Sequence, residues 1–139
     1  MFTKILVASD GSKHAISAAE KAVYIASSNP KAELEIVYIV DPSTSKSDVL
    51  HNVDKVTVEM ERKARLKETE QRFIEKGIEY KVTMLHGEPG PSIVEYANQN
   101  HFDLVVIGSR GLNTLQEMVL GSVSHKVAKR VNCPVLIVK

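Results

Sequence analysis

The stretch LVVIGSRGLNTLQEMVLGS, residues 104–122, joins a short apolar run to a segment that contains three of the chain's seven glycines. Its first four residues do not alternate with polar ones, which is typical of a parallel strand covered on both faces. Three other runs have the same character: ILVA at 5–8, LEIVYIV at 34–40 and VLIV at 135–138. A fifth run, YKVTML at 80–85, alternates in part and is expected at a sheet edge.

In the segments between these runs, apolar residues recur at intervals of three and four residues, which predicts helices. In residues 11–29, Ser12 is the expected N-cap of a helix whose buried stripe comprises Ile16, Ala19, Val23 and Ala26. A second helix is expected over residues 47–76, with Gly77 as its stop signal. Its apolar stripe moves to another helix face part-way along: the first part comprises Val49, Val53, Val56, Met60 and Ala64, and the second comprises Leu66 and Phe73. Further helices are expected at 92–99 and after Gly121, the latter with inward-facing Val123, Val127 and Val131.

This alternation of strands and helices predicts an α/β fold, a doubly wound parallel sheet with helices on both faces, in a single domain that spans residues 1–139. The carboxyl ends of parallel strands share one edge of a sheet, and such folds bind ligands there, near the switch in strand order. Asp10, residues 39–41, His86 and Gly108 all follow predicted strands. The sequence therefore points to one edge as the binding site.

Composition excludes several classes of function. The formal net charge is +1, 5% of the residues are aromatic and Trp is absent, so we expect no nucleic-acid partner. The single Cys133 cannot form an internal disulfide, and the five histidines have no HxxxH or HxH spacing, so no metal site is expected. Because no secretion signal or run of ~18 apolar residues is found, we expect no membrane partner and a cytoplasmic location.

The glycines after the 104–107 run admit two interpretations. Each glycine can simply be a turn residue between two elements of secondary structure. Alternatively, Gly108 and Gly111 allow positive φ and close approach of backbone amides to a phosphate, while Gly121 and Ser122 begin a helix whose amino end favours anions. Ser124 adds a hydroxyl donor, and Arg110 adds a charge that suits a phosphate. Neither GxxxxGK[ST] nor GxGxxG occurs in the chain.

The other strand ends leave alternatives open. Asp10 can bond a ribose hydroxyl, hold a metal or support the start of the helix that follows it. No histidine is expected to lie beside a serine as a base, so the sequence predicts no catalytic residues.

Gly108, Gly111, Gly121 and Ser122 form the pattern Gly-x2-Gly-x9-Gly-Ser/Thr, which resembles the universal stress protein family. The opening KILVASDGS and the segment from VVIGSRG to the last residue are similar to the corresponding parts of that family, so the resemblance covers essentially the whole chain. It implies a Rossmann-like, five-stranded parallel sheet in the order 3-2-1-4-5, as in adenine nucleotide alpha hydrolases, and ATP binding.

The resemblance also implies roles for individual residues. Asp10 matches the family's ribose-contacting acid, and Ala8 and Ser9 match neighbouring nucleotide-lining positions, although relatives often have Pro or Val at the first of these. Ile39 matches the position whose backbone meets adenine. The phosphate loop and the helix start beneath it correspond to Gly108, Gly111, Gly121, Ser122, Val123 and Ser124.

The sequence thus predicts an ATP-binding stress-response sensor or regulator, with Mg2+ as a companion ion and little or no hydrolysis, because no base to activate water is evident. One alternative is a slow ATPase or an adenylate-forming enzyme on the same fold, although ASDGS does not match the SGGxD loop of the sister ATP pyrophosphatases. Another is a partner-binding domain without a nucleotide. The apolar last strand, residues 135–138, would be an exposed edge, so a homodimer is expected there.

Overall fold

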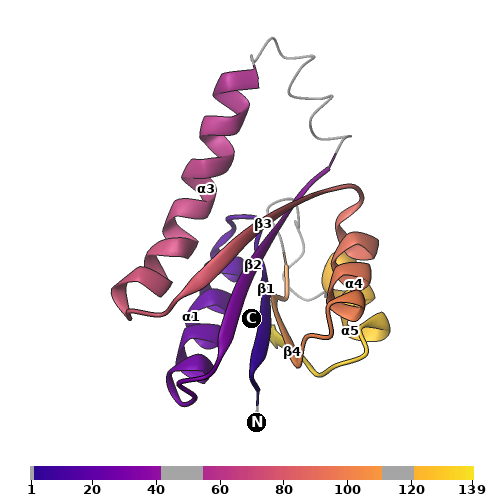
Figure 1. Ribbon diagram of the computed structural model, residues 1–139. Helices are drawn as coiled ribbons and strands as arrows, with labels where there is room; N and C mark the ends of the chain where they lie inside the picture. The colour runs from indigo at the N-terminus through magenta and orange to yellow at the C-terminus, as the bar shows by residue number, and fades with distance from the viewer. Residues whose placement is uncertain (1, 42–54, 111–120) are drawn as a thin grey trace.

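The computed structural model describes residues 2–41, 55–110 and 121–139 (Figure 1). Strands and helices alternate along these residues, as the apolar runs predict. In chain order they are β1 (Lys4–Ala8), α1 (Lys13–Ser27), β2 (Glu33–Val40), α3 (Lys55–Glu75), β3 (Tyr80–His86), α4 (Pro89–Gln99), β4 (Leu104–Gly108), α5 (Ser122–Arg130) and β5 (Val135–Val138).

The strands form a parallel sheet in the order β3-β2-β1-β4-β5. This is the order that the family resemblance implies, and it places the partly alternating β3 at an edge, as predicted. Helices α1 and α3 lie on one side of the sheet, whereas α4 and α5 lie on the other (Figure 1). The fold is therefore a doubly wound α/β sheet.

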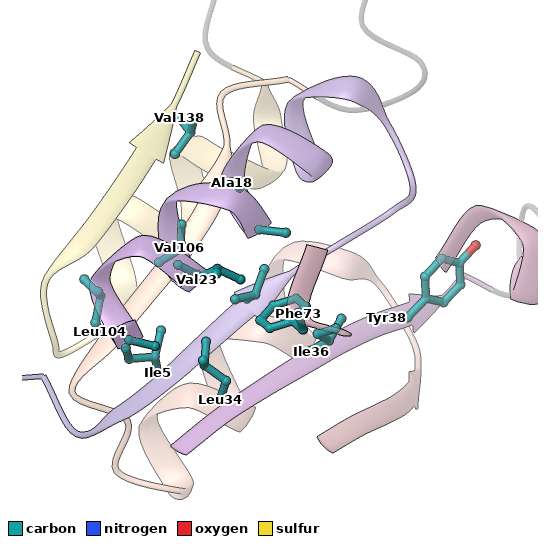
Figure 2. Packing of buried hydrophobic residues seen from close by; sticks show 14 of the residues in the cluster. Ile5, Ala18, Val23, Leu34, Ile36, Tyr38, Phe73, Leu104, Val106 and Val138 are labelled. Atoms are coloured by element: carbon teal, nitrogen blue, oxygen red, sulfur yellow. The ribbon is translucent and has the colours of Figure 1, made fainter. Parts of the chain in front are cut away.

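The strands bury side chains on both faces, which explains why their sequences do not alternate. In β1, Ile5 and Val7 belong to the cluster beneath α1 and α3, and Leu6 and Ala8 belong to the cluster beneath α4 and α5. Figure 2 shows the first cluster, in which Phe73 of α3 lies beside β2 and is fully buried. The two cores enclose the middle strands of the sheet.

Helix α1 begins as predicted, because the Ser12 hydroxyl accepts a hydrogen bond from the Ala15 amide at 3.2 Å. Its buried stripe is broader than the predicted one, and Ile16 is only half-buried. The residues that face the sheet are small, a composition that lets a helix backbone approach closely; they are Ala15, Ala18, Ala19, Ala22, Val23 and Ala26.

The predicted stripe of α3 is partly wrong. Met60 is 66% exposed and Ala64 is exposed, whereas Leu66, Thr69 and Phe73 are buried. The amino-terminal part of α3 projects beyond the sheet, so it has no sheet surface to cover there (Figure 1). The helix stops at Gly77 with φ +64, as predicted. Val49, Val53 and the side chain of Val56 lie outside the described residues.

The helices on the other face differ slightly from prediction. Helix α4 begins at Pro89 instead of Ser92, because proline fits the first turn of a helix, where its missing N–H is not needed. In α5, Val127 is fully buried and Val123 is half-buried. Val131 follows the helix as its C-cap and is half-buried against the same cluster. The predicted inner side of α5 is confirmed.

A polar contact joins α4 to the sheet within this second layer. The Glu35 carboxylate of β2 accepts hydrogen bonds from the Tyr96 hydroxyl and, at 3.1 Å, from the Thr83 hydroxyl. Lys81 lies 3.7 Å from its other oxygen. Burial, and then the hydrogen bond to Glu35, raise the pKa of Tyr96 above its ordinary value. The buried charge is thus satisfied by neighbouring strand and helix residues.

Candidate nucleotide site

The carboxyl ends of β1 and β4 lie side by side, since Val7 pairs with Val106. The chain leaves β1 toward α1 and leaves β4 toward the start of α5. The strand order also reverses here, because β2 pairs with β1 on one side and β4 pairs with it on the other. This is the switch point at which doubly wound sheets bind ligands.

The turn after β1 is held by its own side chains. The Ser12 amide donates to Oδ1 of Asp10 at 2.9 Å, and the Gly11 amide donates to the Ser9 hydroxyl at 3.3 Å. Ser9 is itself buried and bonds the buried Thr69 hydroxyl of α3 at 3.2 Å. The Asp10 carboxylate therefore supports the helix start through one oxygen, and the turn fixes the position of the other.

Gly11, which the sequence interpretation did not single out, has a positive φ in the turn after β1. Its φ is +79, and a Cβ there would lie 2.5 Å from Cβ of Arg65. The position therefore needs glycine for both backbone conformation and space. Its signal was the Asp-Gly-Ser sequence directly after a strand, a common turn composition.

Gly108 is needed for a reason that the sequence did not show. Positive φ was expected of the loop glycines, but among the described glycines only Gly11, Gly77 and Gly87 have it. A Cβ at Gly108 would instead lie 2.7 Å from Cβ of His14 and 2.8 Å from its carbonyl carbon. The missing side chain thus lets the first turn of α1 pack directly on the end of β4.

The start of α5 is tied to the end of β4. The Gly121 amide donates to the Ser109 carbonyl at 2.9 Å, and the Ser124 hydroxyl donates to the Gly108 carbonyl at 2.6 Å. Because this hydroxyl is buried and its proton is used, Ser124 can meet an anion only through its backbone amide. Gly121 is the N-cap, so Ser122 is the first helical residue of α5.

The first-turn amides of α5 belong to Ser122, Val123 and Ser124. Amides in this part of a helix have no carbonyl acceptor within the helix, and the helix dipole favours a nearby anion by ~0.3 to 1 kcal/mol. Ser122 is exposed and Val123 is half-buried. This helix start is therefore suited to a phosphate group.

The remaining predicted residues are distributed around the same edge. Ala8 is buried in the core beneath it, Ile39 is half-buried near the end of β2, and Arg110 is half-buried two residues after β4. Gly111 lies outside the described residues. The structure therefore brings both ends of the predicted phosphate loop to the edge.

A histidine and a serine meet at this edge, contrary to the sequence interpretation. Nδ1 of His14 lies 3.5 Å from Oγ of Ser109, and both residues are half-buried. His86, which ends β3 at this edge, and His125 of α5 are exposed. Only the pairing of β1 with β4 brings together residues so far apart in the chain, so no local pattern signals this contact.

In the part of the chain that the structure describes, no group of three or more His, Cys, Asp or Glu residues is placed to hold a metal ion. Among the helices of those same residues, none combines the length and the apolar character that crossing a membrane requires.

The model of the universal stress protein family matches residues 1–139. The chain belongs to the universal stress protein family. It is 36% identical over 149 residues to universal stress protein YxiE of Bacillus subtilis, a similarity that covers the whole of both chains.

Solved structures of this family share the fold. MJ0577 superposes with a TM-score of 0.83 at 30% identity and covers 100% of this chain and 96% of its own. A universal stress protein determined in complex with cAMP has a TM-score of 0.72 at 29% identity, covering 99% of this chain and 97% of its own. At least one protein with this fold therefore binds an adenine nucleotide.

Proposed function

We propose that this universal stress protein, acting as a single domain in the cytoplasm, binds ATP with Mg2+ and serves as a nucleotide-dependent sensor or regulator of the stress response. The observation that carries the proposal is the convergence of the Asp10 turn and the start of α5 on either side of Gly108. The cAMP complex of a relative supports an adenine nucleotide as the ligand.

The residues at the edge fit the chemistry of a nucleotide. The Asp10 carboxylate suits a ribose hydroxyl, with Ser9 and Ala8 beneath it, and the backbone of Ile39 suits an adenine ring. The phosphates would meet backbone amides and one guanidinium group in the segment from β4 to α5, at Gly108, Arg110, Gly111, Gly121, Ser122, Val123 and Ser124. When bound, ATP would supply a chain of phosphates for these donors.

The place of Mg2+ follows from its ligand preferences. The ion keeps several waters and binds one or two carboxylates together with substrate phosphates. Asp10 and Asp41 follow β1 and β2 at this edge and are half-buried. The ion would therefore enter with the triphosphate instead of occupying a site of its own.

Turnover should be slow. Hydrolysis needs a base or polar group that positions the attacking water. His14, the histidine beside the switch point, faces a serine hydroxyl instead. If ADP or AMP and pyrophosphate were released at well above one turnover per minute, the slow ATPase or adenylate-forming enzyme would replace the sensor.

Binding is tested by calorimetry and thermal shift with ATP, cAMP and GTP, each with and without Mg2+. At a ligand concentration of 100 Kd, ATP should stabilise the fold by ~2.7 kcal/mol. Gly121→Val should abolish this effect without unfolding the sheet, because its Cβ would lie 3.3 Å from the Ser109 carbonyl. Gly77→Val controls for backbone strain: its φ of +64 makes valine costly there, but no atom lies within 4 Å of its Cβ position, so ATP should still stabilise this variant. Undetectable binding at millimolar ATP and Mg2+ would exclude the proposal.

A second copy of the chain is the proposed partner. β5 (Val135–Val138) is an edge strand of the described sheet, and Leu136 is 37% exposed on it. An apolar edge of this kind invites pairing with another strand, and a two-fold axis would close the contact.

A further inference from the structure

Helix α3 lies directly against the turn that carries Asp10. A Cβ atom at Gly11 would be 2.5 Å from Cβ of Arg65 and 3.1 Å from its carbonyl oxygen, so this residue of α3 faces the turn. One helical turn further on, the Thr69 hydroxyl lies 3.2 Å from that of Ser9, and the two are hydrogen-bonded. Residues four apart lie on the same side of a helix, so both contacts fix α3 against this turn.

The side chain of Arg65 starts at the level of the turn and leads toward the binding edge. A helix that joins two parallel strands runs antiparallel to them, so α3 begins at the carboxyl edge of the sheet and projects beyond it (Figure 1). In a helix, the bond from Cα to Cβ tilts toward the amino end. The Arg65 side chain therefore leads from the turn toward the carboxyl edge, beside Asp10.

The charge of Arg65 has no ionic partner within the described residues. The side chain is exposed, and in that part of the chain it forms no ion pair, not even with Glu61 or Glu68 on the same helix. Glu61 and Glu68 stand at the i−4 and i+3 positions, where such pairs commonly form. The guanidinium group therefore keeps its charge available for a ligand at the edge.

Asp10 and Arg65 offer different chemistry to a nucleotide. A carboxylate accepts hydrogen bonds, so it suits a ribose hydroxyl and repels a phosphate. A guanidinium group only donates, and it binds phosphate oxygens through two parallel hydrogen bonds. The phosphates on the 5′ side of the nucleotide are assigned to the start of α5, which covers the opposite face of the sheet from α3. Arg65 is therefore suited to a different phosphate, one attached to the ribose.

We propose that the site takes adenine nucleotides that carry an additional phosphomonoester on the ribose, and that Arg65 recognises this phosphate; the inference rests on the proposed nucleotide binding. One ribose hydroxyl bonds the Asp10 carboxylate, while the neighbouring ribose oxygen carries the phosphate that pairs with Arg65. The ligand class is thus an adenosine bisphosphate, with one phosphate at the start of α5 and one beside α3.

Calorimetry with the whole protein compares adenosine 2′,5′-bisphosphate and adenosine 3′,5′-bisphosphate with AMP and ADP. ADP is the matched ligand, because its two phosphates are both on the 5′ side. One bisphosphate should bind ~10-fold more tightly than AMP to the wild type, and this preference should be lost in Arg65→Gln, whereas the affinity for ADP should not change. Which bisphosphate is preferred identifies the ribose oxygen that lies beside α3.

Lys63→Gln is the matched control variant. Lys63 is also exposed, and its substitution removes the same charge from the same helix, but a residue two positions away lies on the opposite side of a helix. The preference for the bisphosphate should therefore be retained in Lys63→Gln. Circular dichroism and urea unfolding establish that both variants fold like the wild type. As a second readout, the Nε–H signal of Arg65 in nitrogen-edited NMR spectra should shift with the preferred bisphosphate and not with ADP.

The outcomes separate this inference from the proposed function. If AMP and ADP bind but neither bisphosphate is preferred, or if the preference survives in Arg65→Gln, the inference is wrong and the proposed function stands. If the preference is lost equally in Lys63→Gln, a general effect of charge explains it, and the assignment to Arg65 is overturned. If the wild type binds no adenine nucleotide, the proposed function fails, and this inference fails with it.

Discussion

Replacing Gly108 by alanine tests the close approach of α1 to β4. The added methyl group would lie 2.7 Å from Cβ of His14, 2.8 Å from its carbonyl carbon and 2.9 Å from its carbonyl oxygen. Two of these are backbone atoms, so the contact cannot be relieved by rotating a side chain, and the first turn of α1 must move. Overpacking costs ~1 to 3 kcal/mol, and the stiffer unfolded chain offsets ~0.4 to 1 kcal/mol.

Because both backbone contacts are shorter than 3.0 Å, the cost lies at the upper end of this range, and we expect Gly108→Ala to lower the free energy of unfolding by ~2 kcal/mol. For a domain of this size, that loss lowers the melting temperature by about 6 to 8 °C. Urea unfolding followed by circular dichroism measures the change, and an unchanged m-value would show that the loss is one of native-state stability.

Gly77→Ala is the matched control for this experiment. Gly77 has φ +64 but no atom within 4 Å of its Cβ position, so alanine there should cost about 1 kcal/mol from backbone strain alone. Nucleotide binding should be weakened in Gly108→Ala and unchanged in Gly77→Ala. A Gly108→Ala protein within ~0.5 kcal/mol of the wild type would show that α1 does not pack on β4 as described.

Three further changes test other parts of the structure. Thr69→Val removes the buried hydrogen bond to Ser9 and should cost ~1 to 2 kcal/mol in urea unfolding and weaken ATP binding, whereas Thr69→Ser should restore both; equal behaviour of the two variants would contradict the role of the hydroxyl. Burial and Glu35 raise the pKa of the Tyr96 hydroxyl in the folded protein above its ordinary value of 10.0. The hydroxyl therefore adds its full stability below pH 10, and this stability is lost as the pH rises through the pKa of the folded state. Tyr96→Phe should therefore be less stable at pH 8 and lose less stability between pH 9 and 11; an identical pH profile would refute the coupling. Leu136→Glu, at the exposed edge of β5, should shift the protein from dimer to monomer in sedimentation velocity, and a dimer that persists would exclude that edge as the interface.

The sheet could be predicted from sequence because its strands are short apolar runs between helices. Runs of that kind are typical of parallel strands that are covered by helices on both faces. The strand order came from the family resemblance, since periodicity alone does not state which strands are neighbours. Two helix ends could also be predicted, the start of α1 at Ser12 and the end of α3 at Gly77. Both residues act on backbone groups close to them in the sequence, so a local pattern is enough to reveal them.

What the sequence did not show depends on contacts between distant residues. The spacing of Met60 and Ala64 resembles that of a buried stripe, but spacing does not reveal where the sheet beneath a helix ends. Likewise, Gly108 was attributed to a phosphate although its nearest constraint is His14, which the chain brings there from α1. The hydroxyl of Ser124 was taken for an anion donor, and only the fold shows that it bonds a carbonyl.

The alanines of α1 have a consequence for how this edge can change during evolution. Because Ala15, Ala18, Ala19 and Ala22 set the separation between the helix and the sheet, a larger residue at any of them would lift the helix and carry His14 away from Ser109. Buried side chains that cannot reach a ligand thus control the positions of residues that can. Substitutions along the buried side of this helix would tune chemistry at the edge of the sheet without altering a single group that touches the ligand.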